Sequence, residues 1–145
     1  MFDKICGHFV ALGELRVPRR IYSSESAHGL LIDSEHRVAF AACEDNATLV
    51  MFDLAAKKQI ATYKTGDDPD VLAFDPGLKR LYVSAESGVV AIFEENAGGL
   101  ELLDKSLFAP KAHTVSVDPA THKVYFPLQD IDGKPVLRIA VPTEL

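Results

Sequence analysis

The sequence predicts an all-β protein built from repeated four-stranded antiparallel modules, and three observations lead to this fold class. One pattern occurs three times: an apolar strand that ends in aspartate, a short turn, and a second apolar strand. The closing residues Asp33, Asp75 and Asp118 lie 42 and 43 residues apart. No segment of the 145-residue chain shows the apolar stripe of an amphipathic helix. A period of about 40–45 residues is typical of one blade of a β-propeller.

The strands of each copy follow in a fixed order. The first strand alternates apolar side chains with small or polar ones; the three copies lie at 28–33, 70–75 and 113–118. A basic residue precedes or begins the second strand of each copy: Arg37, Arg80 and Lys123. Third strands are predicted at 48–53, 89–94 and 135–140. Fourth strands are predicted at 59–64 and 101–106.

These strands divide the chain into an N-terminal segment and three blades. We expect the segment at 1–26, the first blade at 27–66, the second at 67–110 and the third at 111–145. Arg16–Tyr22 is predicted to be the outer strand of a preceding blade, and the third blade lacks an outer strand of its own. The prediction is therefore a partial propeller of about three four-stranded antiparallel blades, half of a six- or seven-bladed ring.

Two of the three turns share an Asp-Pro motif. Asp-Pro-Gly-Leu-Lys-Arg-Leu-Tyr-Val-Ser spans 75–84, and Asp-Pro-Ala-Thr-His-Lys-Val-Tyr-Phe spans 118–126. These motifs resemble the D-P-x-x-x-R-x-Y-V core of the YVTN-repeat β-propeller family over about Ala27 to Val141, although the copy at Asp33 has no proline and is one residue shorter. The resemblance implies a bacterial or archaeal origin and a parent protein that is periplasmic or secreted. The motifs encode turns and packing, so they specify fold and not function.

Composition and charge exclude several classes of partner. Fifteen Lys and Arg against 21 Asp and Glu give a formal net charge of −6, which disfavours binding to a phosphate backbone. The apolar runs are shorter than the roughly 18 residues that span a bilayer, and the N-terminal stretch does not read as a signal peptide. We therefore expect neither nucleic acid nor membrane as a partner. Cys6 and Cys43 are too few for a disulfide framework, although one bridge between them stays open.

An arc of three blades would expose an apolar blade face at each end, because propellers close with about 4–8 blades. Two alternatives follow. The chain is part of a longer propeller whose missing blades cover these faces, or two copies join head to tail into a six-bladed ring. In the ring, Arg16–Tyr22 completes the last blade of the neighbouring copy.

Histidine and carboxylate side chains are predicted to gather at one mouth of the central channel. The start of each innermost strand shares a face with the loop between the second and third strands of its blade. The innermost strands start at His28, Asp70 and His113, and the loops add Glu44 and Glu86. These five residues are the predicted ligand-binding set. His28, Asp70 and His113 are the predicted ligands of a divalent metal, because imidazole and carboxylate suit borderline and hard cations.

Other interpretations of the mouth stay open. It suits a cationic or polyhydroxylated small molecule equally well, and a histidine at a strand entrance often only bonds a neighbouring carbonyl. Two functions are therefore considered: a non-catalytic binding or scaffold module, and a metal-dependent propeller enzyme of the lactonase or lyase kind. We favour the binding module, because the sequence shows neither a nucleophile elbow nor a glycine-rich phosphate cradle. His36 and His122, in turns on the opposite face, are expected to be solvated.

Overall fold

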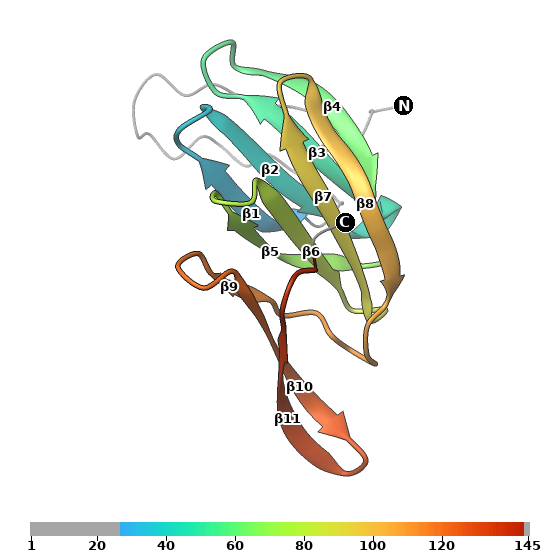
Figure 1. Cartoon of the computed structure of the whole chain (residues 1–145). Helices are drawn as coiled ribbons and strands as arrows, with labels where there is room; N and C mark the ends of the chain where they lie inside the picture. Colours follow the sequence, from blue (N-terminus) through green and yellow to red (C-terminus); the bar gives the residue numbers. More distant parts are fainter. Residues whose placement is uncertain (1–26, 144–145) are drawn as a thin grey trace, which may run out of the picture.

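The computed structural model describes residues 27–143, which form three antiparallel sheets arranged as successive blades (Figure 1). Blade 1 contains β1 (Ala27–Asp33), β2 (Val38–Cys43), β3 (Thr48–Asp53) and β4 (Lys58–Lys64). Blade 2 contains β5 (Pro69–Asp75), β6 (Arg80–Ala85), β7 (Val89–Asn96) and β8 (Gly99–Leu107). Blade 3 contains β9 (Ser116–Asp118), β10 (Lys123–Ile131) and β11 (Lys134–Ala140). The predicted all-β fold of antiparallel blades is confirmed.

Each blade pairs its strands in chain order, so the topology is a simple meander. Helical structure among the described residues is limited to one 3-10 turn, η1 (Glu44–Asn46), between β2 and β3. None of these residues belongs to a helix that could cross a membrane. The strand predicted at Arg16–Tyr22 lies outside the described part of the chain.

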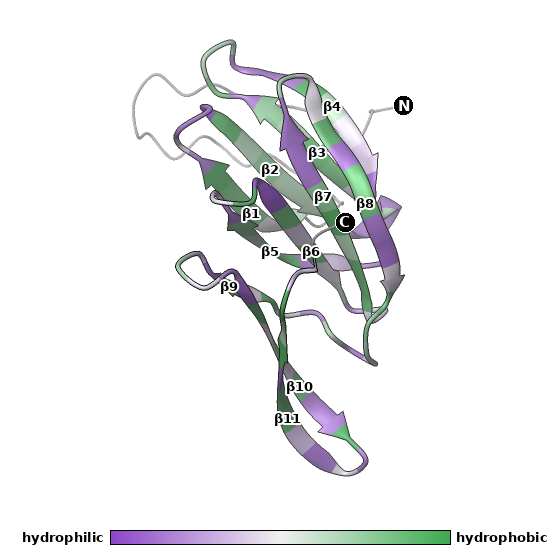
Figure 2. Cartoon of the chain, in the orientation of Figure 1, coloured by the Kyte–Doolittle hydropathy of each residue, from purple (hydrophilic) through white to green (hydrophobic). Residues whose placement is uncertain are grey.

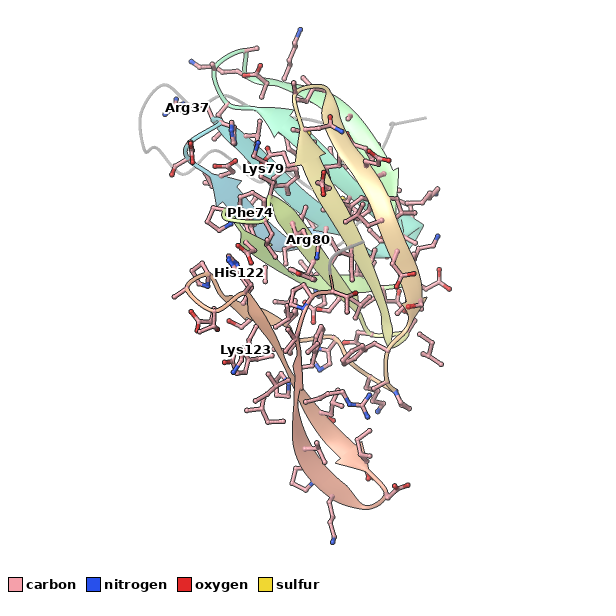
Figure 3. The ribbon with its side chains drawn as sticks, viewed as in Figure 1. Arg37, Phe74, Lys79, Arg80, His122 and Lys123 are labelled. Carbon is pink, nitrogen blue, oxygen red and sulfur yellow. The ribbon has the colours of Figure 1, made fainter. Side chains whose placement is uncertain are left out.

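The three aspartate-closed turns repeat in their hydrogen bonds as well as in sequence. In each turn Oδ1 of the aspartate accepts the backbone N–H two residues further on, at 2.9, 3.0 and 3.0 Å in Asp33, Asp75 and Asp118. The residue before the next strand adopts a left-handed conformation, with φ of 59°, 54° and 59° in Arg37, Lys79 and His122. Figure 3 shows these last three residues at successive blades. The sequence repeat therefore corresponds to a repeat of backbone geometry.

Two apolar layers join the blades. The layer between blades 1 and 2 includes Phe40, Leu49, Leu81 and Phe93, all of them buried. Tyr82, next to Leu81 on β6, faces the other way into a layer with Val90, Val124 and Phe126 between blades 2 and 3. Successive residues of a strand point to opposite faces. Blade 2 is therefore apolar on both faces, which explains why the sequences of β6 and β7 contain continuous apolar runs and do not alternate.

The end strands β1 and β11 contain hydrophobic residues (Figure 2), and several of their side chains are exposed. Leu30 and Ile32 on β1 are 71% and 57% exposed, whereas Leu31 between them packs against blade 2. On β11, Leu137 and Ile139 are 58% and 51% exposed. On the outer face of blade 1, exposure of apolar side chains among β1 to β3 is confined to β1, because a buried apolar cluster on the same face is formed by Ala39, Val50 and Phe52 of β2 and β3.

Candidate functional site

Bulges shape the strand entrances at the predicted mouth. The register of β1 shifts between Ala27 and Leu30, and that of β5 shifts between Pro69 and Leu72, so His28 and Asp70 both lie within irregular strand starts. A bulge bends a strand locally and re-aims its side chains. Gly29 permits β1 to approach β5 closely, because a Cβ at this position would overlap the carbonyl oxygen of Asp70.

Three of the five predicted residues come together between blades 2 and 3. Asp70 of β5 and His113, in the segment that precedes β9, are joined by a 2.9 Å contact between Oδ2 and Nδ1. Glu86 follows β6, and donor atoms of the three residues lie within 4.8 Å of one another. The buried Ser84 hydroxyl lies 2.6 Å from the carbonyl oxygen of His113 and so holds this segment in place. Asp70 and His113 are partly exposed, so a ligand from solvent can reach this group, which we call the mouth cluster.

The other two predicted residues form a separate pair in blade 1. His28 Nδ1 lies 2.8 Å from Glu44 Oε1, and η1 carries Glu44 to this position. Among the described residues, the groups of three or more donors do not include His28 or Glu44. Glu44 lines a neighbouring cavity of about 670 Å³ together with three further acidic residues and two lysines: Asp45, Asp67, Asp68, Lys64 and Lys105.

The two histidines of the turns on the opposite face are partly solvated, as expected, and each is also hydrogen-bonded to an aspartate. His36 Nδ1 lies 2.6 Å from Asp33 Oδ2, within one turn of blade 1. His122 Nδ1 lies 2.7 Å from Asp75 Oδ2 and joins blade 3 to blade 2. Both histidines are about half exposed, whereas both aspartates are buried. The short spacing of His36 after Asp33 was the available sequence signal for the first pair.

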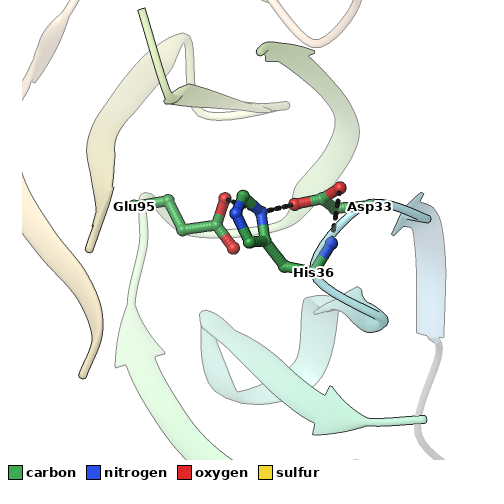
Figure 4. Close-up of side chains that lie close together, drawn as sticks. All are labelled: Asp33, His36 and Glu95. Carbon is green, nitrogen blue, oxygen red and sulfur yellow. Dashed lines mark hydrogen bonds and ion pairs between the residues drawn. The ribbon is translucent and has the colours of Figure 1, made fainter. Parts of the chain in front are cut away.

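Glu95 is a further buried acid that the sequence interpretation missed. The predicted third strand of blade 2 ended at Glu94, but β7 continues to Asn96, and Asn96 pairs with Gly99 across the hairpin. Glu95 therefore lies within the strand, where its backbone N–H donates to the carbonyl of Lys79 at 2.8 Å. Its side chain is only 6% exposed and points toward His36 (Figure 4).

The charges of Asp33, His36 and Glu95 influence one another. Burial raises the pKa of Asp33, but hydrogen bonds from the side chain and backbone of His36 outweigh it and hold that pKa below its ordinary value. The hydrogen bond to Asp33, together with the charge of Glu95, raises the pKa of His36. Burial, followed by the negative charge of Asp33, raises the pKa of Glu95. The two buried carboxyl groups thus favour a positive charge between them.

Comparison with known proteins places the fold among β-propellers. No family model and no curated protein matches the sequence. Among solved structures, a candidate 6-phosphogluconolactonase from Bacteroides fragilis matches with a TM-score of 0.69 and 19% identity over 83% of this chain. A dihydro-heme d1 dehydrogenase has a TM-score of 0.64 and 19% identity over 82% of the chain. The Swd1 β-propeller domain from Myceliophteria thermophila has a TM-score of 0.60 and 12% identity over 81%.

These similarities concern the fold alone, because each of the three structures is less than 25% identical to the chain. The matched region covers 36%, 29% and 41% of the three proteins, respectively. The chain therefore spans less than half the length of each of them. The described residues form a partial β-propeller.

Proposed function

We propose that the chain is part of a YVTN-type β-propeller that acts as a non-catalytic binding module, with a small cationic ligand held at the mouth cluster. The observation that carries this proposal is the convergence of Asp70, Glu86 and His113 from two blades, with donor atoms within 4.8 Å of one another. Two carboxylates beside a partly exposed imidazole attract a cation from solvent. The acidic cavity beside Glu44 extends the same charge preference across this face.

The surroundings of Ser84 do not suit a nucleophile. A serine nucleophile needs a base that takes its proton and space for the substrate. Ser84 is fully buried, and its hydroxyl lies within hydrogen-bonding distance of the carbonyl oxygens of His113 and Val71. It faces acceptors that hold its proton in place, so we assign it a structural role.

A metal-dependent enzyme is the second candidate, and the donor set of the mouth cluster favours it. One imidazole and two carboxylates suit a divalent transition metal, and such an ion would supply Lewis-acid activation of water. Asp70, Glu86 and His113 would hold the ion, and the fold similarity to a candidate 6-phosphogluconolactonase makes a lactone the first substrate to examine.

Calorimetric titration separates these two functions. We expect spermidine, as a cationic probe, to bind the chain saturably, with at least tenfold weaker binding by the Asp70→Asn and His113→Ala variants. Asp118→Asn is the matched control, since Asp118 also lies on the first strand of a blade but at the opposite face. Binding of Mn²⁺ that depends on Asp70, together with lactone hydrolysis, would replace the first function by the second. If Asp70→Asn binds spermidine and Mn²⁺ with the same affinities as the wild type, the mouth cluster is neither a cation site nor a metal site.

We further propose that a second copy of this chain covers the outer blade faces. One chain carries both halves of such a contact, Leu137 and Ile139 on β11 at one end and Leu30 and Ile32 on β1 at the other. A head-to-tail arrangement brings these two faces together and is a heterologous contact. Burial of the four exposed apolar side chains would favour the assembly.

A further inference from the structure

A second group of metal-ligating side chains lies on the face opposite the mouth, where blade 1 meets blade 2 (Figure 4). Its members are Asp33 at the end of β1, His36 in the following turn, and Glu95 of β7; we call it the junction cluster. Donor atoms of the three residues lie within 4.8 Å of one another. The side chains of Asp33 and Glu95 are 5% and 6% exposed, whereas His36 is 48% exposed.

Glu95 provides a separate indication that a ligand is bound here. Its Oε2 atom is buried and has no hydrogen-bond partner. Burial without a partner is costly for a carboxylate oxygen, because it loses the water that would otherwise solvate it. This oxygen lies 3.4 Å from His36 Nδ1 and faces the space between the three side chains. A cation in that space would give Oε2 a direct bond in addition to its 3.4 Å ion pair with His36.

One of the two donor distances to His36 matches that of a tetrahedral metal site, and the other is shorter. With metal–ligand bonds of about 2.0–2.1 Å, neighbouring donors of such a site lie about 3.3–3.4 Å apart. His36 Nδ1 and Glu95 Oε2 are already 3.4 Å apart. His36 Nδ1 and Asp33 Oδ2 are 2.6 Å apart, so Asp33 would have to move outward by about 0.8 Å.

We propose that Asp33, His36 and Glu95 bind a zinc-type divalent metal that ties blade 1 to blade 2. One nitrogen and two oxygen donors suit Zn²⁺, whereas Ca²⁺ prefers a larger set composed of oxygen alone. Three protein ligands leave a fourth position open. His36 and Glu95 also line a cavity of about 460 Å³ with Val38, Met51 and Lys79, through which water or a small oxygen ligand can reach that position.

The junction cluster does not follow from the repeat, because its third ligand occurs in only one blade. The backbone N–H of Glu95 donates to the carbonyl of Lys79, and Leu54 makes the same bond to Arg37 in blade 1. By strand register, Pro142 takes this position in blade 3. The Asp75–His122 pair between blades 2 and 3 therefore has no third carboxylate of this kind.

The test is a calorimetric titration of the full chain with ZnCl₂, combined with the zinc content after dialysis. All variants carry His113→Ala, so that the mouth cluster does not contribute. In this background we expect the chain to bind one zinc ion. We expect Glu95→Gln to lower the zinc affinity at least tenfold. The matched control is Glu94→Gln, which changes the exposed neighbouring acid of β7 and is expected to leave the affinity unchanged.

His36→Ala gives an independent reading, because His36 is half exposed and its replacement spares the apolar layers. We expect this change also to weaken zinc binding at least tenfold, and zinc to raise the melting temperature of Glu94→Gln but not of Glu95→Gln. The proposal is overturned if the His113→Ala protein binds no zinc. It is equally overturned if Glu95→Gln and His36→Ala bind zinc as tightly as the Glu94→Gln control. The three side chains of the junction cluster would then be joined by hydrogen bonds and would not bind the metal.

Discussion

Replacing Leu81 with alanine is expected to lower the free energy of unfolding by about 3–4 kcal/mol. Leu81 is fully buried in the apolar layer between blades 1 and 2, where it belongs to the same cluster as Phe40 and Phe93. The substitution removes buried methyl groups and leaves a cavity, because strands fixed in a hydrogen-bonded sheet cannot move in to fill it. Urea unfolding monitored by circular dichroism measures the loss.

Leu107→Ala is the matched control, since it makes the same chemical change at the exposed end of β8. Leu107 is 68% exposed, and its replacement is expected to change the free energy of unfolding by no more than about 0.5 kcal/mol. Equal losses from the two substitutions would contradict the assignment of Leu81 to a buried layer between blades 1 and 2.

Asp75→Ala is expected to cost about 3 kcal/mol, because the side chain is fully buried and serves two blades. Oδ1 accepts the backbone N–H groups of Gly77 and Leu78 at 3.0 and 3.2 Å, which fixes the turn. Oδ2 lies 2.7 Å from His122 Nδ1 of blade 3. Removing the carboxylate leaves the N–H groups of the turn without their acceptor and breaks the link between the blades. The same unfolding measurement gives the cost.

Asp118→Ala provides the comparison at the equivalent position of blade 3. Asp118 makes the same kind of turn, accepting from the backbone of Ala120 and the hydroxyl of Thr121, but these bonds are exposed. Its loss is expected to cost about 1 kcal/mol. A loss at Asp118 as large as that at Asp75 would mean that the turn alone, and not the link between blades, determines the cost.

The blades were predictable from sequence because turns and strand alternation are local. The Asp-Pro turns and the 42- and 43-residue spacing predict the strand order without knowledge of any distant contact. Glu95 was missed because its position depends on the end of β7. The sequence Asn-Ala-Gly-Gly is typical of a hairpin with a two-residue turn. Recognising this turn extends the strand to Asn96 and places the side chain of Glu95 on the face of the sheet opposite to that of the exposed Glu94.

The candidate site was only partly predictable, because the predicted innermost strands are not equivalent in the structure. β1 and β5 begin near His28 and Asp70, whereas β9 begins only at Ser116. His113 therefore lies before its strand and contacts Asp70 of the preceding blade, while His28 contacts Glu44 of its own blade. Contacts between blades depend on how the sheets are placed against one another, which a single repeat does not specify.

Sedimentation equilibrium of the purified chain tests most directly whether three blades form an incomplete ring that needs a neighbour. One chain has a mass of 15.8 kDa, and we expect an assembly of at least two chains. Ile139→Glu, which places a charge on the outer face of blade 3, is expected to dissociate it, whereas Glu94→Gln is expected to leave it intact. A folded, monodisperse monomer that unfolds cooperatively would contradict the account.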